Sequence, residues 1–260
     1  MLVLLPPSEG KSAPRRGRPL DLAALSFPAL HEPRAAVLDA LVSLCQDRPA
    51  EEAAAVLGIG PTQLDLVHRN ADLASAPAAR ADRVYSGVLY EALDLGSLPA
   101  GARRRAAGRL VVVSSLLGLV RTTDHVPAYR LSGQNSLPDL GPVSGHWSRH
   151  LGASVVEAAR DGLVVDLRSS SYVPFWRPEK EHARRVATVR VLHETDGRRS
   201  VVSHFNKATK GRLVRDLLTD GSDPRTPARF AELLSDLGWT VETTDGPSGA
   251  TRLDVVVRQL

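Results

Sequence analysis

A mixed α/β (α+β) fold is predicted for this chain: one compact domain over residues 1–260, with a central mixed β-sheet flanked by helices. The first observation is a set of short, fully apolar runs such as Leu110–Val113, which are typical of central strands covered on both faces. The second is the alternation of these runs with segments of helical periodicity. The third is the Asp-Gly turn signal in Thr195–Arg198, which predicts a β-hairpin.

The apolar and polar patterns place the elements along the chain. Segments rich in Pro, Gly and Ser predict loops at Ser12–Pro28 and Ser132–Pro142. Strands are expected at Leu2–Leu5, Leu110–Val113, Leu163–Val165, Val186–Leu192, Ser200–Phe205 and Leu253–Val257. Helices are expected at Ala35–Cys45, Ala50–Leu57, Thr62–Leu73, His146–Ala159, Lys207–Leu218 and Thr226–Leu237.

The composition is that of a soluble globular protein, with 43% hydrophobic and 24% charged residues. Met1–Pro7 lacks the basic segment and cleavage site of a signal peptide and reads as a first strand. No apolar stretch approaches the roughly 20 residues that span a bilayer, so no membrane partner is expected. Cys45, the only cysteine, excludes an internal disulfide and lies on an apolar helical stripe, as a buried structural thiol would. A cytoplasmic location is the expectation.

Positive charge comes in clusters, including Arg15–Arg18 and Arg103–Arg105, within a net charge of +4. Such clusters are typical either of a nucleic-acid footprint or of solvated loops and helix faces. Lysine is rare in this arginine-rich chain, and three of the four lysines fall in two polar motifs that follow strand-like runs. Since lysine is a mobile point charge with an adjustable pKa, its retention there suggests that the ammonium group itself is needed. The lysines are Lys11, Lys180, Lys207 and Lys210.

Polar segments follow four of the expected strands. If these strands share one sheet and direction, their carboxyl ends meet in one cleft rich in Lys, Arg, Ser and Asp, where ligands of α/β sheets bind. The alternative is that strand ends are polar because loops are polar. The segments are Ser8–Lys11, Ser114–Ser115 with Arg121–Asp124, Asp166–Tyr172, and His204 with the paired lysines.

Three groups of residues are candidates for binding an anion or another polar ligand, and each also has a purely structural interpretation. Lys207 and Lys210 share one face at the start of a helix, where they hold either a phosphate or solvent. The Gly58–Gly60 link between two expected helices resembles a helix-hairpin-helix element at about 50–73, or is a tight turn. The Asp166–Ser171 segment either binds a polar ligand or contains a buried Asp–Arg pair.

Two further patterns are weighed for chemistry. Tyr129 beside Arg130 is suited to stacking a base and gripping its phosphate. His146 and His150 have helical spacing but no third ligand nearby, so no metal site and no cofactor are expected.

Six motifs occur along the chain in this order: Pro6–Lys11, Val84–Gly87, Ser114–Arg121, Pro127–Leu131, Asp166–Ser169 and His204–Gly211. Together they resemble the YaaA peroxide-stress-response family. The resemblance, which runs from Met1 to the final strand, implies a cytoplasmic bacterial protein of the cantaloupe fold. It also implies a positively charged cleft and a helix-hairpin-helix-like element that bind DNA, and protection against peroxide, iron and hydroxyl radical. Better-known relatives carry Ser-Pro-Ala-Lys, so Glu9 is an added carboxylate here.

Two hypotheses follow for function. In the first, the chain is a stress protein that binds DNA, without sequence specificity, through an electropositive cleft. Its contacts would be Lys11, Gly58, Gly60, Arg121, Tyr129, Arg130, Arg168, Lys207 and Lys210. In the second, the same cleft holds a nucleotide-like or phosphorylated small molecule for an enzymatic reaction. Its catalytic candidates are Ser8, Glu9, Lys11, Asp166, Ser169 and Lys207. Direct iron sequestration finds no convincing ligand cluster.

Overall fold

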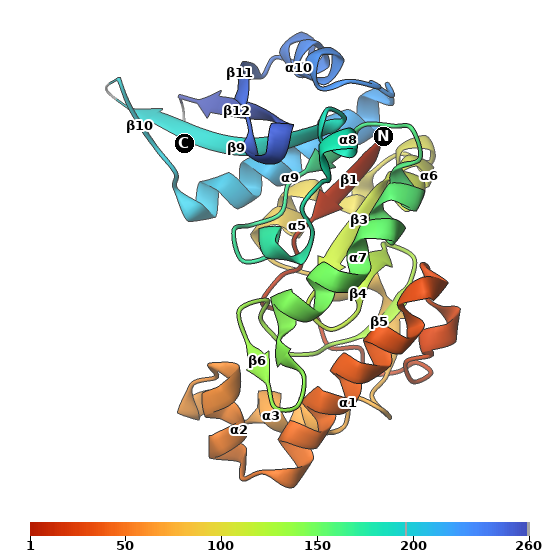
Figure 1. The fold of residues 1–260 in the computed structure, drawn as a ribbon. Coiled ribbons are helices and arrows are strands. Elements are labelled where there is room, and N and C mark those ends of the chain that lie inside the picture. Colours follow the sequence, from red (N-terminus) through yellow and green to blue (C-terminus); the bar gives the residue numbers. More distant parts are fainter. Residues whose placement is uncertain (196, 259–260) are drawn as a thin grey trace.

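The computed structural model describes residues 1–195 and 197–258, apart from the side chains of Ser203 and His204, and confirms the mixed α/β fold (Figure 1). In this part of the chain, one sheet has the strand order β11-β12-β9-β8-β1-β3-β4, with β10 paired to β9. These strands are β1 (Leu2–Leu5), β3 (Leu110–Ser114), β4 (Gly118–Arg121), β8 (Val164–Asp166), β9 (Val186–Thr195), β10 (Arg198–Ser200), β11 (Thr240–Asp245) and β12 (Thr251–Val257). Two small two-stranded antiparallel sheets lie outside it: β2 (Ala78–Arg80) with β5 (His125–Pro127), and β6 (Ser136–Leu137) with β7 (Gly141–Pro142).

The centre of the sheet is parallel. β1 pairs in parallel with β3 on one side and with β8 on the other, so that Leu4 lies between Val111 and Asp166. β8, β9 and β12 continue in parallel, whereas β4 and β11 run antiparallel at the two edges. The segments that follow β1, β3 and β8 therefore emerge at one edge of the sheet, which we call the carboxyl edge.

Successive side chains along each strand point to opposite faces of the sheet, so apolar strands make both faces apolar. Helices cover both of these faces. Leu2 and Leu4 belong to one apolar core, whereas Val3 and Leu5 belong to another. The first core includes residues of α1 (His31–Asp47), α2 (Ala50–Leu57), α3 (Asp65–Ala71), α4 (Ala81–Val84) and α7 (Val143–Ala159). The second includes residues of α5 (Val88–Leu93), α6 (Ala100–Arg109), α9 (Ser203–Asp220) and α10 (Pro227–Asp236). A short helix, α8 (Lys180–Ala183), precedes β9.

Short 3-10 turns complete the described elements. They are η1 (Leu22–Ala24), η2 (Pro28–Leu30), η3 (Pro61–Gln63), η4 (Leu95–Ser97), η5 (Val173–Phe175) and η6 (Pro247–Gly249). In none of the described helices do length and apolarity together suffice to cross a membrane.

The six predicted helices are present, although three of them begin earlier than predicted: α1 at His31, α7 at Val143 and α9 at Ser203. The helix expected at Thr62–Leu73 is divided into η3 and α3, since Pro61 begins a tighter turn. The helix expected from Lys207 begins four residues earlier, at Ser203. This earlier start makes the strand predicted at Ser200–Phe205 wrong: β10 ends at Ser200, and its partner β9 pairs only as far as that residue. The β9–β10 hairpin is confirmed on both sides of its turn, although Asp196 lies outside the described residues.

Candidate functional site

The carboxyl edge brings together three of the predicted polar segments. Ser8 to Lys11 follow β1, Ser114 ends β3, and Arg168 follows β8. The fourth predicted contribution differs, because β10 runs antiparallel to β9 and the chain after it enters α9. His204, at the start of that helix, has a side chain outside the described residues. The edge is therefore built mainly by β1, β3 and β8, as their parallel pairing requires.

Lys11 is the central cation of this edge. Its backbone forms an isolated bridge with Tyr85, and its ammonium group donates one hydrogen bond of 2.9 Å to the Ser8 carbonyl oxygen. Nζ also lies 3.9 Å from the centre of the Tyr129 ring, within the range of a cation–π contact. The residue stays partly exposed, yet desolvation lowers the pKa of Lys11 to about 7. No described carboxylate lies within ion-pair distance of this ammonium group, so no negative charge counters the desolvation.

A cluster of hydroxyl groups lies next to the Lys11 side chain. The Tyr129 hydroxyl lies 2.7 Å from Ser114 Oγ and 3.2 Å from the Tyr85 hydroxyl. Burial raises the pKa of both tyrosines, so both phenols remain neutral. Tyr129 is 3% exposed, which leaves its ring no open face for a nucleic-acid base. The prediction that Tyr129 stacks a base is therefore wrong, and the ring supports Lys11 instead.

The loop that carries Lys11 is fixed by contacts from distant segments. Tyr90 donates a 2.7 Å hydrogen bond to the Pro6 carbonyl, and the Ser86 backbone N–H donates to Ser8 Oγ at 3.1 Å. Glu9, an exposed residue, forms an ion pair with Arg130. Asn70 in turn holds the Arg130 backbone from both sides, at 2.7 and 2.8 Å. The added carboxylate thus orients Arg130 and leaves it partly exposed at the carboxyl edge.

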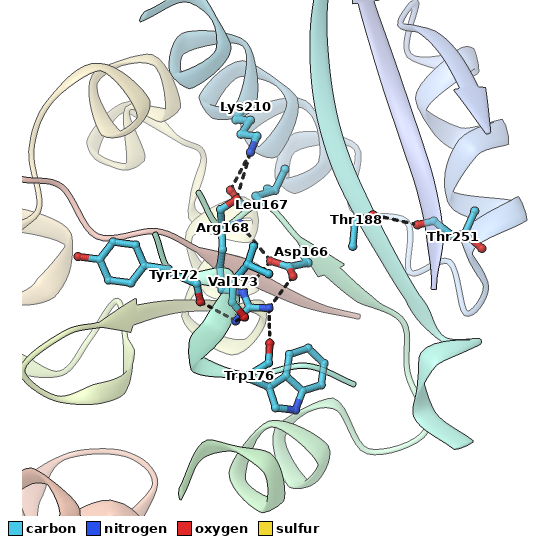
Figure 2. Close-up of polar contacts among 9 residues, drawn as sticks. All are labelled: Asp166, Leu167, Arg168, Tyr172, Val173, Trp176, Thr188, Lys210 and Thr251. Carbon is cyan, nitrogen blue, oxygen red and sulfur yellow. Dashed lines mark hydrogen bonds and ion pairs between the residues drawn. The ribbon is translucent and has the colours of Figure 1, made fainter. Parts of the chain in front are cut away.

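Arg168 is an internal brace (Figure 2). Its guanidinium group donates to both carboxylate oxygens of Asp166, at 2.8 and 2.7 Å. It also donates to the carbonyl oxygens of Tyr172 and Trp176, at 3.0 and 2.9 Å. Burial alone would raise the pKa of Asp166, but the charge and hydrogen bonds of Arg168 outweigh it and hold that pKa below its usual range. With its side chain 1% exposed, Arg168 has no surface for a phosphate, contrary to the sequence prediction.

The two lysines of α9 have different roles. Lys210 is buried, and its ammonium group donates to the Leu167 and Arg168 carbonyl oxygens at 3.0 and 3.4 Å (Figure 2). Desolvation lowers the pKa of Lys210 to about 8, and the charge of Asp166 partly opposes this shift. Lys207 is exposed. Of the predicted pair, only Lys207 presents its charge to solvent.

Two other predicted phosphate contacts lie elsewhere. Arg121 ends the antiparallel strand β4 and pairs with Val111 near the start of β3. It therefore lies at the end of the strands opposite to the carboxyl edge. Its Nη1 donates to the Gly108 carbonyl at 2.6 Å. The antiparallel direction of β4 is therefore the reason why Arg121 does not join Lys11.

The predicted hairpin at Gly58–Gly60 joins α2 to η3 and α3, at the lower end of the view in Figure 1. Gly58 adopts φ 63° and ends α2, and its N–H donates to helix carbonyl oxygens, which removes it as a phosphate donor. The Ile59 N–H likewise donates to the Ala54 carbonyl at 2.8 Å. Residues 50–73 also include four carboxylates and one arginine, a charge balance that opposes phosphate binding. The role of Gly60 as a phosphate contact stays a prediction.

A basic groove that the sequence did not delimit lies beside the Lys11 loop. This arginine groove has a volume of about 630 Å³, and its lining includes Arg16, Arg18, Arg80 and Arg83. The chain after Lys11 runs along residues 77–85, with Ser12 N–H bonded to the Val84 carbonyl and Ala78 N–H bonded to the Arg18 carbonyl. Arg15–Arg18 was recognisable as a cluster; its approach to Arg80 and Arg83 depends on this long-range pairing.

Gly17 keeps the two sides of the arginine groove together. It adopts φ +153°, and a Cβ at this position would lie 2.3 Å from the Ala78 carbonyl oxygen. Arg80 is paired with Asp82, but Arg16, Arg18 and Arg83 are exposed and form no ion pair within the described ranges. Two carboxylates also line the groove: Asp124 is buried and already accepts hydrogen bonds from Ser26 and the Arg121 N–H, and the exposed Asp21 accepts one from the Ala23 N–H, so the three unpaired arginines outnumber the one exposed carboxylate. The groove therefore presents an excess of free positive charge.

A second pocket, of about 360 Å³, lies beside the Asp166–Arg168 pair. Trp176, Arg177 and Arg252 line it as well. Within the described ranges, one group has the spacing of a metal site: Glu179, Glu181 and His182, whose ligand atoms lie within 4.8 Å of one another. The ring of His146, one of the two histidines with helical spacing in the sequence, lies 3.0 Å from the Pro33 carbonyl oxygen through its Nε2.

Comparisons with known proteins connect this architecture to a family. The family model described as peroxide stress protein YaaA matches residues 1–244. A UPF0246 protein of Streptomyces coelicolor is 51% identical, with all of both chains covered. A UPF0246 protein of Corynebacterium efficiens is 39% identical over 95% of this chain and 96% of the relative. The chain therefore belongs to the YaaA family of peroxide stress proteins.

Proposed function

We propose that this peroxide stress protein is a cytoplasmic DNA-binding protein that recognises the phosphate backbone and thereby limits damage from iron and hydroxyl radical. The observation that carries the proposal is the arginine groove, in which three exposed arginines have no described ion-pair partner. Lys11 and Arg130 at the carboxyl edge, and Lys207 in α9, are partly or fully exposed cations as well. Such charges attract phosphates without reading sequence.

The shape and chemistry of the groove suit an extended polyanion. Arginine presents a planar fork that matches phosphate oxygens bidentately. Because the chain runs directly from Lys11 to Arg16 and Arg18, the groove and the Lys11 loop form one continuous segment packed on residues 77–85. A duplex seated on this segment would meet several cations in succession. Covering the sugar-phosphate backbone in this way would shield it from diffusing hydroxyl radical.

The test is the salt dependence of duplex binding, measured by fluorescence anisotropy. For B-DNA, each neutralised phosphate contributes about 0.9 to the slope of log K against log salt concentration. Replacing Arg16, Arg18 and Arg83 together by Gln should therefore lower the slope by up to about 2.7 and weaken binding in low salt. A plasmid-nicking assay with ferrous iron and peroxide should show protection by the parent protein and less by this variant.

The matched control removes the same charge from other places. Arg104, Arg149 and Arg225 are exposed and, within the described ranges, form no ion pair. Their triple Gln variant has the same net charge as the groove variant and should retain the parent slope. Equal loss in both variants would mean that overall charge, and not the groove, drives binding. Absence of binding by the parent protein at low salt would overturn the proposal.

A second candidate function is an enzyme acting on a nucleotide-like or phosphorylated small molecule. The 360 Å³ pocket beside Asp166 favours it, because Arg177 and Arg252 line this pocket and offer positive charge. Glu9 is not among the residues that line this pocket, so Glu9→Gln tests only an enzyme that uses Glu9 as its acid or base: such an enzyme would lose turnover, whereas DNA binding would be kept or tightened. Binding of a nucleoside phosphate, followed by calorimetry, would locate the ligand in this pocket if Arg252→Gln weakens it.

A further inference from the structure

We propose that Lys11 is an amine nucleophile that forms an imine with the aldehyde of an abasic deoxyribose in DNA. This inference rests on the proposed DNA binding and adds a chemical step to it. The geometry that supports it is the placement of a partly exposed lysine against the Tyr129 ring, without a described carboxylate partner, at the beginning of the segment that lines the arginine groove.

The surroundings of the ammonium group favour its neutral form. It has one described hydrogen-bond acceptor, the Ser8 carbonyl oxygen, where a fully solvated ammonium group would have three. The neighbouring phenols of Tyr85 and Tyr129 are neutral, and the Glu9 carboxylate is engaged by Arg130. A desolvated lysine of this kind is the form that enzymes use to attack carbonyl carbons. Because the pKa of Lys11 falls to about 7, a large fraction of the amine is neutral near neutral pH.

A purely structural role would not select lysine at this place. Arginine stacks on aromatic rings and stays charged, and it accounts for most of the cations in this chain. A compact amine that loses its proton has a different use, namely covalent chemistry with a carbonyl group. Within DNA, an aldehyde becomes available where a base has been lost and the deoxyribose ring opens. The missing base also leaves room for the half-buried amine to approach C1′.

The step balances without an oxidant or reductant. The neutral Lys11 amine attacks C1′, forming the N–C1′ bond as the π bond of the carbonyl group breaks, and the resulting carbinolamine then loses its C1′–O bond. The carbonyl oxygen leaves as water with the two amine hydrogens, which leaves an imine between Nζ and C1′. In the assay alone, borohydride reduces this imine to a stable secondary amine.

The experiment incubates the full chain with a duplex that contains one abasic site and adds sodium borohydride. A covalent protein–DNA adduct is expected, and peptide mapping should place it on Lys11. Lys11→Arg, which keeps the positive charge but not the nucleophile, should reduce the adduct at least tenfold. The matched variant Lys180→Arg, which alters an exposed lysine outside the proposed binding surface, should retain it. Circular dichroism and thermal melting establish that each variant is folded, and mapping of the parent adduct needs no variant.

Two further arms separate the possible failures. Anisotropy on the same duplex without reductant reports DNA binding: binding without an adduct overturns the Lys11 inference alone, and no binding overturns the proposed function. Free 2-deoxyribose 5-phosphate supplies the same aldehyde without a duplex. Equal trapping of the free sugar at the same concentration would overturn DNA as the source of the aldehyde. An adduct on any other lysine would overturn the assignment to Lys11.

Discussion

Removing the guanidinium group of Arg168 should destabilise the protein without weakening its contact with DNA. Arg168→Gln leaves the buried carboxylate of Asp166 without its partner, and the carbonyl oxygens of Tyr172 and Trp176 without a donor. Breaking a buried ion pair on one side costs about 3–5 kcal/mol. At about 2–4 °C per kcal/mol for a chain of this size, the melting temperature should fall by about 6–20 °C.

Urea unfolding and thermal melting measure this loss, and an exposed pair provides the control. Arg185 lies 2.9 Å from Asp161, whose side chain is 98% exposed, so Arg185→Gln should cost less than about 1 kcal/mol. In a double-mutant cycle with Asp166→Asn, the Arg168 variant should show a coupling of about 0.5–3 kcal/mol. A loss below about 1 kcal/mol for Arg168→Gln, or a DNA salt slope reduced by about 0.9, would refute the internal brace.

The Asp166–Arg168 pair determines the direction in which pH changes the stability of the fold. The folded pKa of Asp166 lies below its unfolded value of about 3.9, so the pair contributes its full stability above that pH. The contribution is lost as the pH falls below about 4 and through the folded pKa. The difference in unfolding free energy between the parent and Arg168→Gln should therefore shrink from pH 7 to pH 3. A constant difference over that range would contradict the account.

Three other outcomes are expected. Gly17→Ala should displace the loop, because the new Cβ would meet the Ala78 carbonyl, and should weaken duplex binding; Gly10→Ala, where nothing lies within 4 Å, is the control. Lys11 should reach half of its maximal labelling rate with acetic anhydride near pH 7, as mass spectrometry would show; a midpoint near the ordinary lysine pKa of about 10.4 would count against the desolvated amine. Burial raises the pKa of Cys45 to about 11, so peroxide should leave this thiol unoxidised in the folded protein and oxidise it in urea; rapid oxidation of the native thiol would be inconsistent with its burial.

Local patterns predicted most of the elements because their causes are local. Ala50–Leu57 and Leu2–Leu5 have the bounds that their periodicity indicates. The strand expected at Ser200–Phe205 failed because the chain leaves the sheet after Ser200 and enters helix α9 at Ser203, with Val201 exposed between them. A short turn joins β3 to β4, and the two strands pair in antiparallel. The local pattern of residues 118–121 did not predict this strand or its direction, because both depend on its pairing with β3.

The candidate site was predictable in outline, since the parallel strands β1, β3 and β8 bring their carboxyl ends together. The state of each cation was not, because burial is a property of the whole fold. Arg168 and Lys210 look like phosphate ligands in sequence but satisfy buried acceptors. Arg80 and Arg83 carry no motif, and they join Arg16 only because residues 12–18 pack along residues 77–85.

Hydrogen–deuterium exchange of the full chain, with and without a duplex, tests the central claim that the arginine groove and the Lys11 loop bind DNA. Bound duplex should slow amide exchange in residues 8–18 and 78–86, and the effect should disappear in the variant that lacks Arg16, Arg18 and Arg83. Unchanged exchange in both segments under saturating DNA, with protection confined to α2–α3 or to α10, would contradict the account.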